Sequence, residues 1–250
     1  MAGGGGVGDP APRPPRSRTV LILLSLLAAL LFVGLLALGT WQVRRLGWKQ
    51  DLIAQVESRI HAAPVPAPGP AAWPRIDATN AAYRRVTLSG HYLADRSVRT
   101  QAATAYGSGF WLMTPLRTDR GFTVLVNRGF VPPRWRDPGL PDAPVTVTGL
   151  LRITEPGGGF LRHNDPAAGR WYSRDVAAIA TAQHLDRVAP YFVDAAADPQ
   201  APADPPIGGL TVIAFPNNHL SYAITWYVLA LMVAGGWWLI LRHERRLRCG

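Results

Sequence analysis

His219 is the residue of this sequence that is best placed to bind a metal centre. It follows Pro216 and the pair Asn217-Asn218, and it comes just before a long apolar stretch. Pro216 should end a preceding strand, and an asparagine side-chain oxygen is a good helix N-cap. We therefore expect a helix to begin here, with His219 in its first turn. Neutral imidazole is a common metal ligand and a standard axial ligand of haem iron.

The residues that share a helical face with His219 would suit a flat ring. At 3.6 residues per turn this face carries Tyr222, Ala223, Trp226 and Ala230. Small and aromatic side chains in this order could form a wall for a planar cofactor. The alternative is an ordinary aromatic belt, because amphipathic rings favour the headgroup region of a bilayer.

Arg45 and Lys49 are the cations nearest to the other apolar stretch that could meet a ligand. They lie one helical turn apart, just after that stretch ends. They could pair with carboxylates of a ligand at the membrane surface. The alternative is contact with lipid phosphates.

The sequence shows no motif of an enzyme. We find no P-loop, no G-x-S-x-G elbow and no H-E-x-x-H, and the six histidines are scattered without zinc-ligand spacing. Cys249 is the one cysteine, so neither a disulfide within the chain nor a C-x-x-C-H haem-attachment site is available. Methionine is scarce as well, which disfavours a copper carrier. We expect a protein that is not an enzyme.

Two apolar stretches bracket the rest of the chain. Residues 20–39 and 222–241 contain no charged side chain, and twenty helical residues span about 30 Å, the thickness of a bilayer core. They predict two transmembrane helices that flank one domain, residues 40–221. A cleaved signal peptide, with Ala37-Leu38-Gly39 as the cleavage site, is the alternative for the first stretch. Because the apolar region is longer than in most signal peptides, we expect an uncleaved anchor.

The basic residues predict the orientation of these helices. The net charge is +10, residues 202–221 contain no Lys or Arg, and four arginines follow the second span. The positive-inside rule places that basic tail, residues 242–250, in the cytoplasm, and with it the Gly/Pro-rich N-terminus, residues 1–18, which we expect to be disordered. No basic patch is interleaved with aromatic residues, so we expect no nucleic acid partner.

The segment between the spans is predicted to form one α+β domain with a mostly antiparallel sheet. Helical spacing over 48–60 predicts that the first helix continues beyond the membrane, and five prolines within 62–74 predict a linker. A helix is expected over 175–185, with Asp175 near its N-terminus, a loop over 194–209, and a strand end and turn over 127–132. Predicted strands, arranged as a meander, cover 84–93, 97–101, 110–116, 123–127, 145–153, 190–193 and 210–215.

Several short segments, in order from about Leu38 to Leu241, form a more specific pattern together than alone. They are Leu38-Gly39-Thr40-Trp41-Gln42-Val43 with Arg45, Trp48 and Lys49; Thr114-Pro115-Leu116; Val124-Leu125-Val126-Asn127-Arg128-Gly129-Phe130-Val131-Pro132; Asn164-Asp165-Pro166 with Trp171 and Arg174-Asp175; Pro206-Ile207-Gly208-Gly209; and Asn218-His219-Leu220 with Tyr222, Thr225 and Trp226. This set resembles the Surfeit locus protein 1 (Surf/Shy) family, assembly factors of haem–copper cytochrome c oxidase.

The resemblance implies a multi-pass protein of the bacterial inner membrane whose domain lies in the periplasm. It implies a role in presenting or stabilising haem a during maturation of the oxidase catalytic subunit, together with the haem a synthesis or insertion machinery. His219 would be the haem ligand, with Trp226 packed against the macrocycle. We add the hypothesis that Arg45 and Lys49 pair with the haem propionates.

Two other functions remain open from the sequence. One is a cofactor-free scaffold that holds oxidase assembly partners, which the lack of an obvious second axial ligand favours. The other is a membrane-anchored hydrolase or redox enzyme, which would need a pocket of convergent reactive groups in the domain.

Overall fold

The structure is a computed structural model that describes residues 16–140, 142–159, 161–198, 204–211 and 217–249. It divides into two compact units: a helical unit, Met1–Leu52 with Phe215–Gly250, and a domain, Ile53–Ala214. Most of the N-terminal segment for which we expected disorder, residues 1–15, lies outside the described residues.

The helical unit is built from two long helices. Helix α1 covers Arg18–His61 and helix α3 covers His219–Cys249, and both are long and apolar enough to cross a membrane. The predicted start of the second helix at His219 and the continuation of the first helix over 48–60 are confirmed. Helix α1 also runs without a break through Ala37-Leu38-Gly39.

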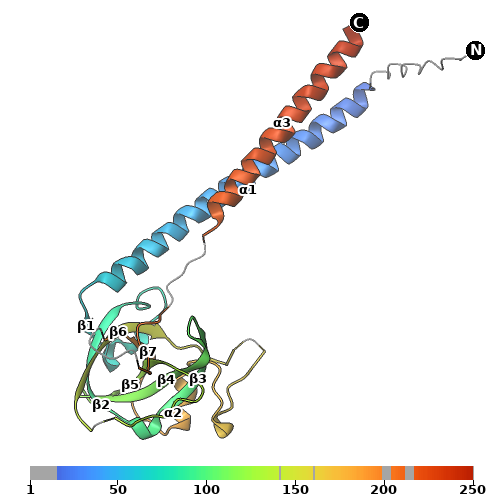
Figure 1. The fold of residues 1–250 in the computed structure, drawn as a ribbon. Coiled ribbons are helices and arrows are strands. Elements are labelled where there is room, and N and C mark those ends of the chain that lie inside the picture. The colour runs from blue at the N-terminus through green and yellow to red at the C-terminus, as the bar shows by residue number, and fades with distance from the viewer. Residues whose placement is uncertain (1–15, 141, 160, 199–203, 212–216, 250) are drawn as a thin grey trace, which may run out of the picture. The chain divides into compact units, whose positions relative to one another are not determined.

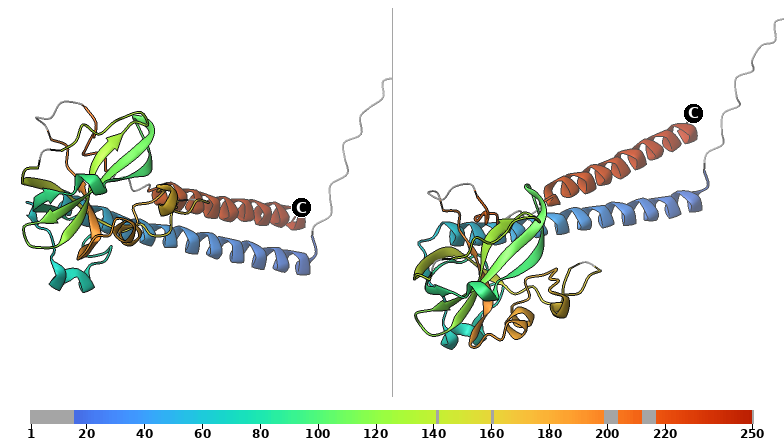
Figure 2. Two further views of the ribbon diagram at one scale, coloured as in Figure 1. Left: turned by 90° about the horizontal axis from the view of Figure 1, so that it is seen from below. Right: turned by 60° about the horizontal axis from the view of Figure 1, so that its bottom comes forward.

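Small side chains let α1 and α3 pack closely. Ala223 and Ala230 of α3 are buried, and a Cβ added at Gly39 of α1 would come within 2.8 Å of the Tyr227 ring. The Tyr227 hydroxyl lies 3.3 Å from Thr40 Oγ1. Figures 1 and 2 show the two helices side by side. Small residues have this role in many helix pairs within membranes, because they allow the backbones to approach.

A second set of contacts ties the far ends of the same helices together. The buried Glu244 of α3 accepts a hydrogen bond from the Arg16 backbone N–H at 3.1 Å. The Arg16 guanidinium lies 3.6 Å from the same carboxylate. Arg248 donates to the Arg16 carbonyl oxygen at 3.0 Å. The helix pair is therefore fixed at both ends by polar contacts.

The domain is a single seven-stranded sheet in the order β1-β2-β6-β7-β5-β4-β3, with an additional pairing of β2 with β4. That pairing closes the five strands β2, β6, β7, β5 and β4 into a barrel (Figure 1). The strands are β1 (Val65–Pro66), β2 (Arg85–Tyr92), β3 (Val98–Thr104), β4 (Gly107–Thr118), β5 (Thr123–Val131), β6 (Val145–Ile153) and β7 (Val188–Ala195).

The α+β class and the mostly antiparallel pairing are confirmed, but the predicted meander holds only for β3-β4-β5 and is wrong beyond it. Strand β5 pairs with β7 in parallel, and β6 lies between β2 and β7. The strand-forming pattern of a sequence determines which residues are extended, whereas the choice of neighbour depends on barrel closure. The predicted linker over 62–74 contains β1 and the 3₁₀ helix η1, Pro70–Arg75. The predicted strand over 210–215 lies mostly outside the described residues.

The turn expected over residues 127–132 is also wrong, because β5 continues through Val131. This strand is buried on both faces. One face joins the barrel core, and the other packs against Ile179 of helix α2, which covers Val176–Ala182. Asp175 caps α2 by accepting from the Ala178 N–H, as expected. Two further 3₁₀ helices are η2 (Ala94–Arg96) and η3 (Pro166–Ala168).

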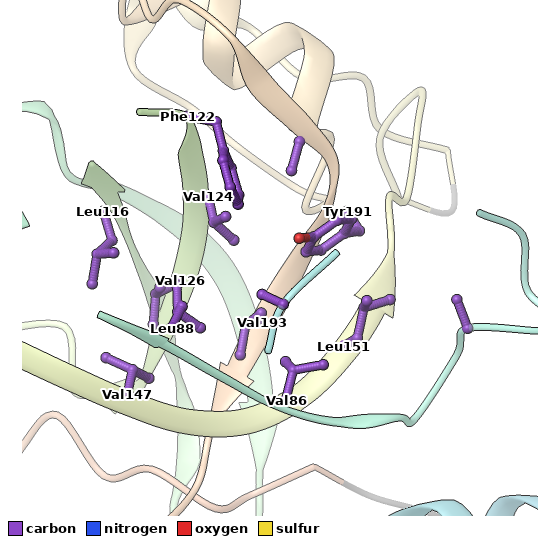
Figure 3. Close-up of a cluster of buried hydrophobic side chains, with 13 residues drawn as sticks. Val86, Leu88, Leu116, Phe122, Val124, Val126, Val147, Leu151, Tyr191 and Val193 are labelled. Carbon is purple, nitrogen blue, oxygen red and sulfur yellow. The ribbon is translucent and has the colours of Figure 1, made fainter. Parts of the chain in front are cut away.

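The barrel interior is filled by aliphatic and aromatic side chains from alternate strand positions (Figure 3). It includes Val86, Leu88, Leu116, Phe122, Val124, Val126, Val147, Leu151, Tyr191 and Val193. The Tyr191 hydroxyl donates to the Pro68 carbonyl oxygen at 2.6 Å, so the one polar group of this cluster that is shown in Figure 3 has a partner.

Candidate functional site

His219 is held by a residue of the other helix. It is the first residue of α3, and its ring is half-buried. Its Nδ1 lies 2.7 Å from the side-chain oxygen Oε1 of Gln42, a residue of α1 that is only 9 % exposed. The bond joins residues 177 positions apart in the chain, so only the packing of α1 on α3 brings them together.

This hydrogen bond decides which nitrogen of the imidazole is available. An amide oxygen can only accept, so the proton of the neutral ring lies on Nδ1. The lone pair of the ring is then on Nε2, which has no hydrogen-bond partner within the described part of the chain. Metal-binding histidines commonly have this arrangement, with one N–H bound to an oxygen and the other nitrogen left as the ligand.

Two polar atoms close to His219 in the sequence are buried without a partner among the described residues. They are the Trp226 indole Nε1 and the Asn217 side-chain oxygen Oδ1. A buried polar group without a hydrogen bond is costly, by about 1–3 kcal/mol. One donor and one acceptor of this kind lie before and after His219 in the sequence, and both atoms are enclosed by protein, so each stays unpaired while the helices are packed in this way.

Two of the α3 residues that we expected to form a wall for a planar cofactor are buried and therefore not available to it. Ala223 and Ala230 are 2 % and 0 % exposed, because they form the contact with α1. A planar ligand has no access to them while the helices are packed. His219 and Trp226 are half-buried and Tyr222 is exposed, so the accessible side of the site lies along the edge of the helix pair.

Arg45 and Lys49 lie on α1, further along the helix than Gln42. At 3.6 residues per turn they follow Gln42 after about one and two turns and share its side of the helix. The Arg45 guanidinium stacks over the Trp48 ring, 4.2 Å from its centroid. Arg45 is exposed and Lys49 is half-buried. Along the helix axis, Arg45 and Lys49 therefore follow Gln42 by about 4.5 and 10.5 Å.

Gln42 is the residue of this site that sequence reasoning missed. A signal was present, because an amide side chain close behind an apolar span needs a hydrogen-bond partner. Its partner could not be read from the sequence, since it lies on the other helix.

The domain contains a second polar cluster, centred on Asp194 of β7. This carboxylate is 5 % exposed and accepts from Asn127 at 2.8 Å and from Thr211 at 2.9 Å. It also accepts from Arg152 at 2.9 Å and Arg174 at 3.3 Å. These side chains line a cavity of about 150 Å³.

The charged side chains of this cluster are paired with one another, as in a network that stabilises a fold. Arg174 holds Glu155 through two hydrogen bonds, of 3.0 and 2.6 Å, so every carboxylate of the cluster is paired with a guanidinium. Gly129 has a φ of +131° and lies directly against the Ile207 carbonyl, where a side chain would collide. Segments 124–132, 171–175 and 206–209, which carried part of the family resemblance, thus converge here for a packing reason.

Buried tyrosines give the clearest pKa shifts of the domain. Burial raises the pKa of Tyr92 to about 12, although the nearby Arg128 guanidinium acts in the opposite direction. Burial also raises the pKa of Tyr191. Neither residue lines the cavity beside Asp194, so these shifts reflect a packed interior rather than a reactive pair.

Comparison with known proteins identifies the family to which this chain belongs. The sequence profile of the SURF1 family matches residues 29–231. Surfeit locus protein 1 of Rattus norvegicus is 36 % identical over 231 residues, which cover 83 % of this chain and 73 % of the rat protein. The human protein of the same name is 35 % identical over 222 residues, or 80 % of this chain and 71 % of its own length. The chain belongs to the SURF1 family.

The matched region of this SURF1 family member includes both units. It takes in the domain and the parts of α1 and α3 that carry Gln42, His219 and Trp226. A SURF1-like protein of Drosophila melanogaster is 33 % identical over 224 residues, 80 % of this chain and 72 % of its own length. Family membership and two helices that are long and apolar enough to cross a membrane indicate a membrane-anchored protein.

Proposed function

We propose that this protein is an assembly factor for haem–copper cytochrome c oxidase that carries haem a on His219. The observation that supports this most strongly is the His219–Gln42 hydrogen bond. It leaves Nε2 of a half-buried imidazole without a partner in the described part of the chain, at the end of an apolar helix. A single imidazole is enough for haem iron, because the macrocycle itself supplies four ligands.

The donor set around His219 fits such a cargo better than a bare metal ion. In the described part of the chain no group of three or more His, Cys, Asp or Glu side chains converges, whereas zinc and copper sites need several protein ligands. In this proposal the half-buried ring of Trp226 would pack against the macrocycle. Arg45 and Lys49 pair with the propionates.

The role is that of a carrier and does not include a chemical step. In the polar cavity of the domain, the Asp194 carboxylate accepts hydrogen bonds from Asn127, Arg152 and Arg174. In this proposal these residues stabilise the domain. The partners that we propose are the oxidase catalytic subunit and the haem a synthesis or insertion machinery. We also propose a bacterial inner membrane location with the domain in the periplasm and both termini in the cytoplasm, which the four arginines after the second span support.

The test is a visible absorption spectrum of protein purified from membranes that make haem a. We expect a Soret band in the wild type that is lost in His219→Ala and kept in His243→Ala. His243 is an exposed histidine near the other end of α3 and is the matched control.

Two outcomes would contradict the haem proposal: no band in the wild type, or equal bands in the wild type and His219→Ala. The scaffold function would then remain, and it predicts that His219→Ala supports normal oxidase maturation. Equal helix content of the variants by circular dichroism ensures that loss of the band reflects the ligand.

A further inference from the structure

Gln42, the hydrogen-bond partner of His219, is held in place by the packing of α1 against α3. Gln42 lies next to a close contact of the helix pair, since Gly39 lies against the Tyr227 ring and Thr40 contacts the Tyr227 hydroxyl. Its side chain is 9 % exposed. A buried amide one turn from this contact has little freedom, so its oxygen is held in front of His219 Nδ1 by the packing of two backbones.

We infer that Gln42 is the positioning residue of the haem site: its side-chain oxygen fixes His219 as the Nδ1–H tautomer, which presents Nε2 as the ligand. This inference rests on the proposed function and deepens it. Without an acceptor at Nδ1, the ring would exchange between its two tautomers and rotate about its side-chain bonds. Both changes reduce the fraction of molecules in which Nε2 carries the lone pair and points toward the ligand.

The choice of an amide over a carboxylate also matters for a carrier. A carboxylate at this position would draw the Nδ1 proton and make Nε2 a stronger donor to the metal. A neutral amide orients the ring without this increase in donor strength. Such a ligand suits a cargo that has to be released, whereas a carboxylate partner suits a permanent cofactor.

The experiment uses the full-length protein in detergent, labelled with ¹⁵N at histidine. In the ligand-free wild type we expect Nδ1 of His219 to give the signal of a protonated nitrogen and Nε2 that of an unprotonated one. We expect averaged signals from exchanging tautomers in Gln42→Leu, and wild-type protonation in Gln42→Glu. Gln50→Leu, which changes an exposed glutamine further along α1, is the matched control and should match the wild type.

The second measurement is the affinity for haem and the rate of its transfer to apomyoglobin. Loss of a partner of this kind weakens metal binding by about 10–100-fold, so we expect this loss in Gln42→Leu. In Gln42→Glu we expect tight binding, slower transfer and a lower reduction potential of the bound iron. The Gln50→Leu variant should be unchanged in all three.

The two proposals fail in different ways. Wild-type ¹⁵N signals in Gln42→Leu, or a haem affinity of that variant within twofold of the wild type, would overturn the role of Gln42. Haem binding that survives His219→Ala would overturn the proposed function, whatever the tautomer of the free protein. Faster transfer from Gln42→Glu than from the wild type would overturn the reason given for a neutral amide.

Discussion

Asp194 shows how much a single buried side chain supports in this domain. It sits opposite Asn127 across the parallel β5–β7 pair and receives two guanidinium groups that are themselves mostly buried, at 17 % and 14 % exposure. Removal of one partner from such a network leaves charges that water cannot reach fully. The residue therefore matters for stability rather than for chemistry.

We expect Asp194→Ala to lower the free energy of unfolding by about 3 kcal/mol, because two guanidinium groups lose their shared carboxylate. The measurement is denaturant unfolding of the full-length protein in detergent, followed by near-UV circular dichroism of the domain. Asp186→Ala, at an exposed position, should change the value by less than about 0.5 kcal/mol. A similar loss in both variants would show that the network contributes little.

At the scale of elements, the contact of α1 with α3 is what assembles the candidate site. It brings Gln42 to His219 and buries Ala223 and Ala230. One close contact is at Gly39, where an added Cβ would come within 2.8 Å of the Tyr227 ring. The site is therefore a property of the helix pair, and neither helix carries it alone.

Gly39→Leu should separate the helices locally and break the Gln42–His219 hydrogen bond. We expect its ¹⁵N histidine signals to resemble those of Gln42→Leu, with haem affinity reduced about tenfold or more. Gly34→Leu is the control, since a side chain there meets open space within 4 Å, and it should behave as the wild type. Intact tautomer signals in Gly39→Leu would mean that the helix contact does not hold the bond.

At the scale of the whole molecule, we expect the distribution of charge to set which side of the membrane each part faces. The second span is followed by four arginines and is preceded by a segment with none. This asymmetry favours a cytoplasmic C-terminus. The one cysteine of the sequence, Cys249, is exposed at that end and can report its location.

We expect a membrane-impermeant maleimide to label Cys249 in inverted membrane vesicles and to leave it unlabelled in spheroplasts. The control is Ser108→Cys in a Cys249→Ser background, an exposed position of the domain that should give the opposite pattern. Labelling of Cys249 in intact spheroplasts would reverse the proposed orientation.

The sequence alone was sufficient for features that depend on local patterns. Two uncharged stretches predicted the long helices, Asn217-Asn218 predicted that α3 begins at His219, and Asp175 predicted the cap of α2; all three are confirmed. Alternating apolar residues predicted β6 over its full length. These features follow from side-chain period and capping, which act within a few residues of the chain.

Tertiary structure decided everything that depends on which elements become neighbours. Parallel pairing of β5 with β7 broke the meander after β5, and β5 continued to Val131 because Phe130 and Val131 pair with β4. Ala223, which sequence reasoning assigned to a ligand wall, is buried by α1, and His219 acquired Gln42 as its partner. The sequence determined that a histidine begins the second helix. Only the packing of α1 against α3 decided which of its nitrogens is free, because a hydrogen bond between residues so far apart in the chain exists only once the helices meet.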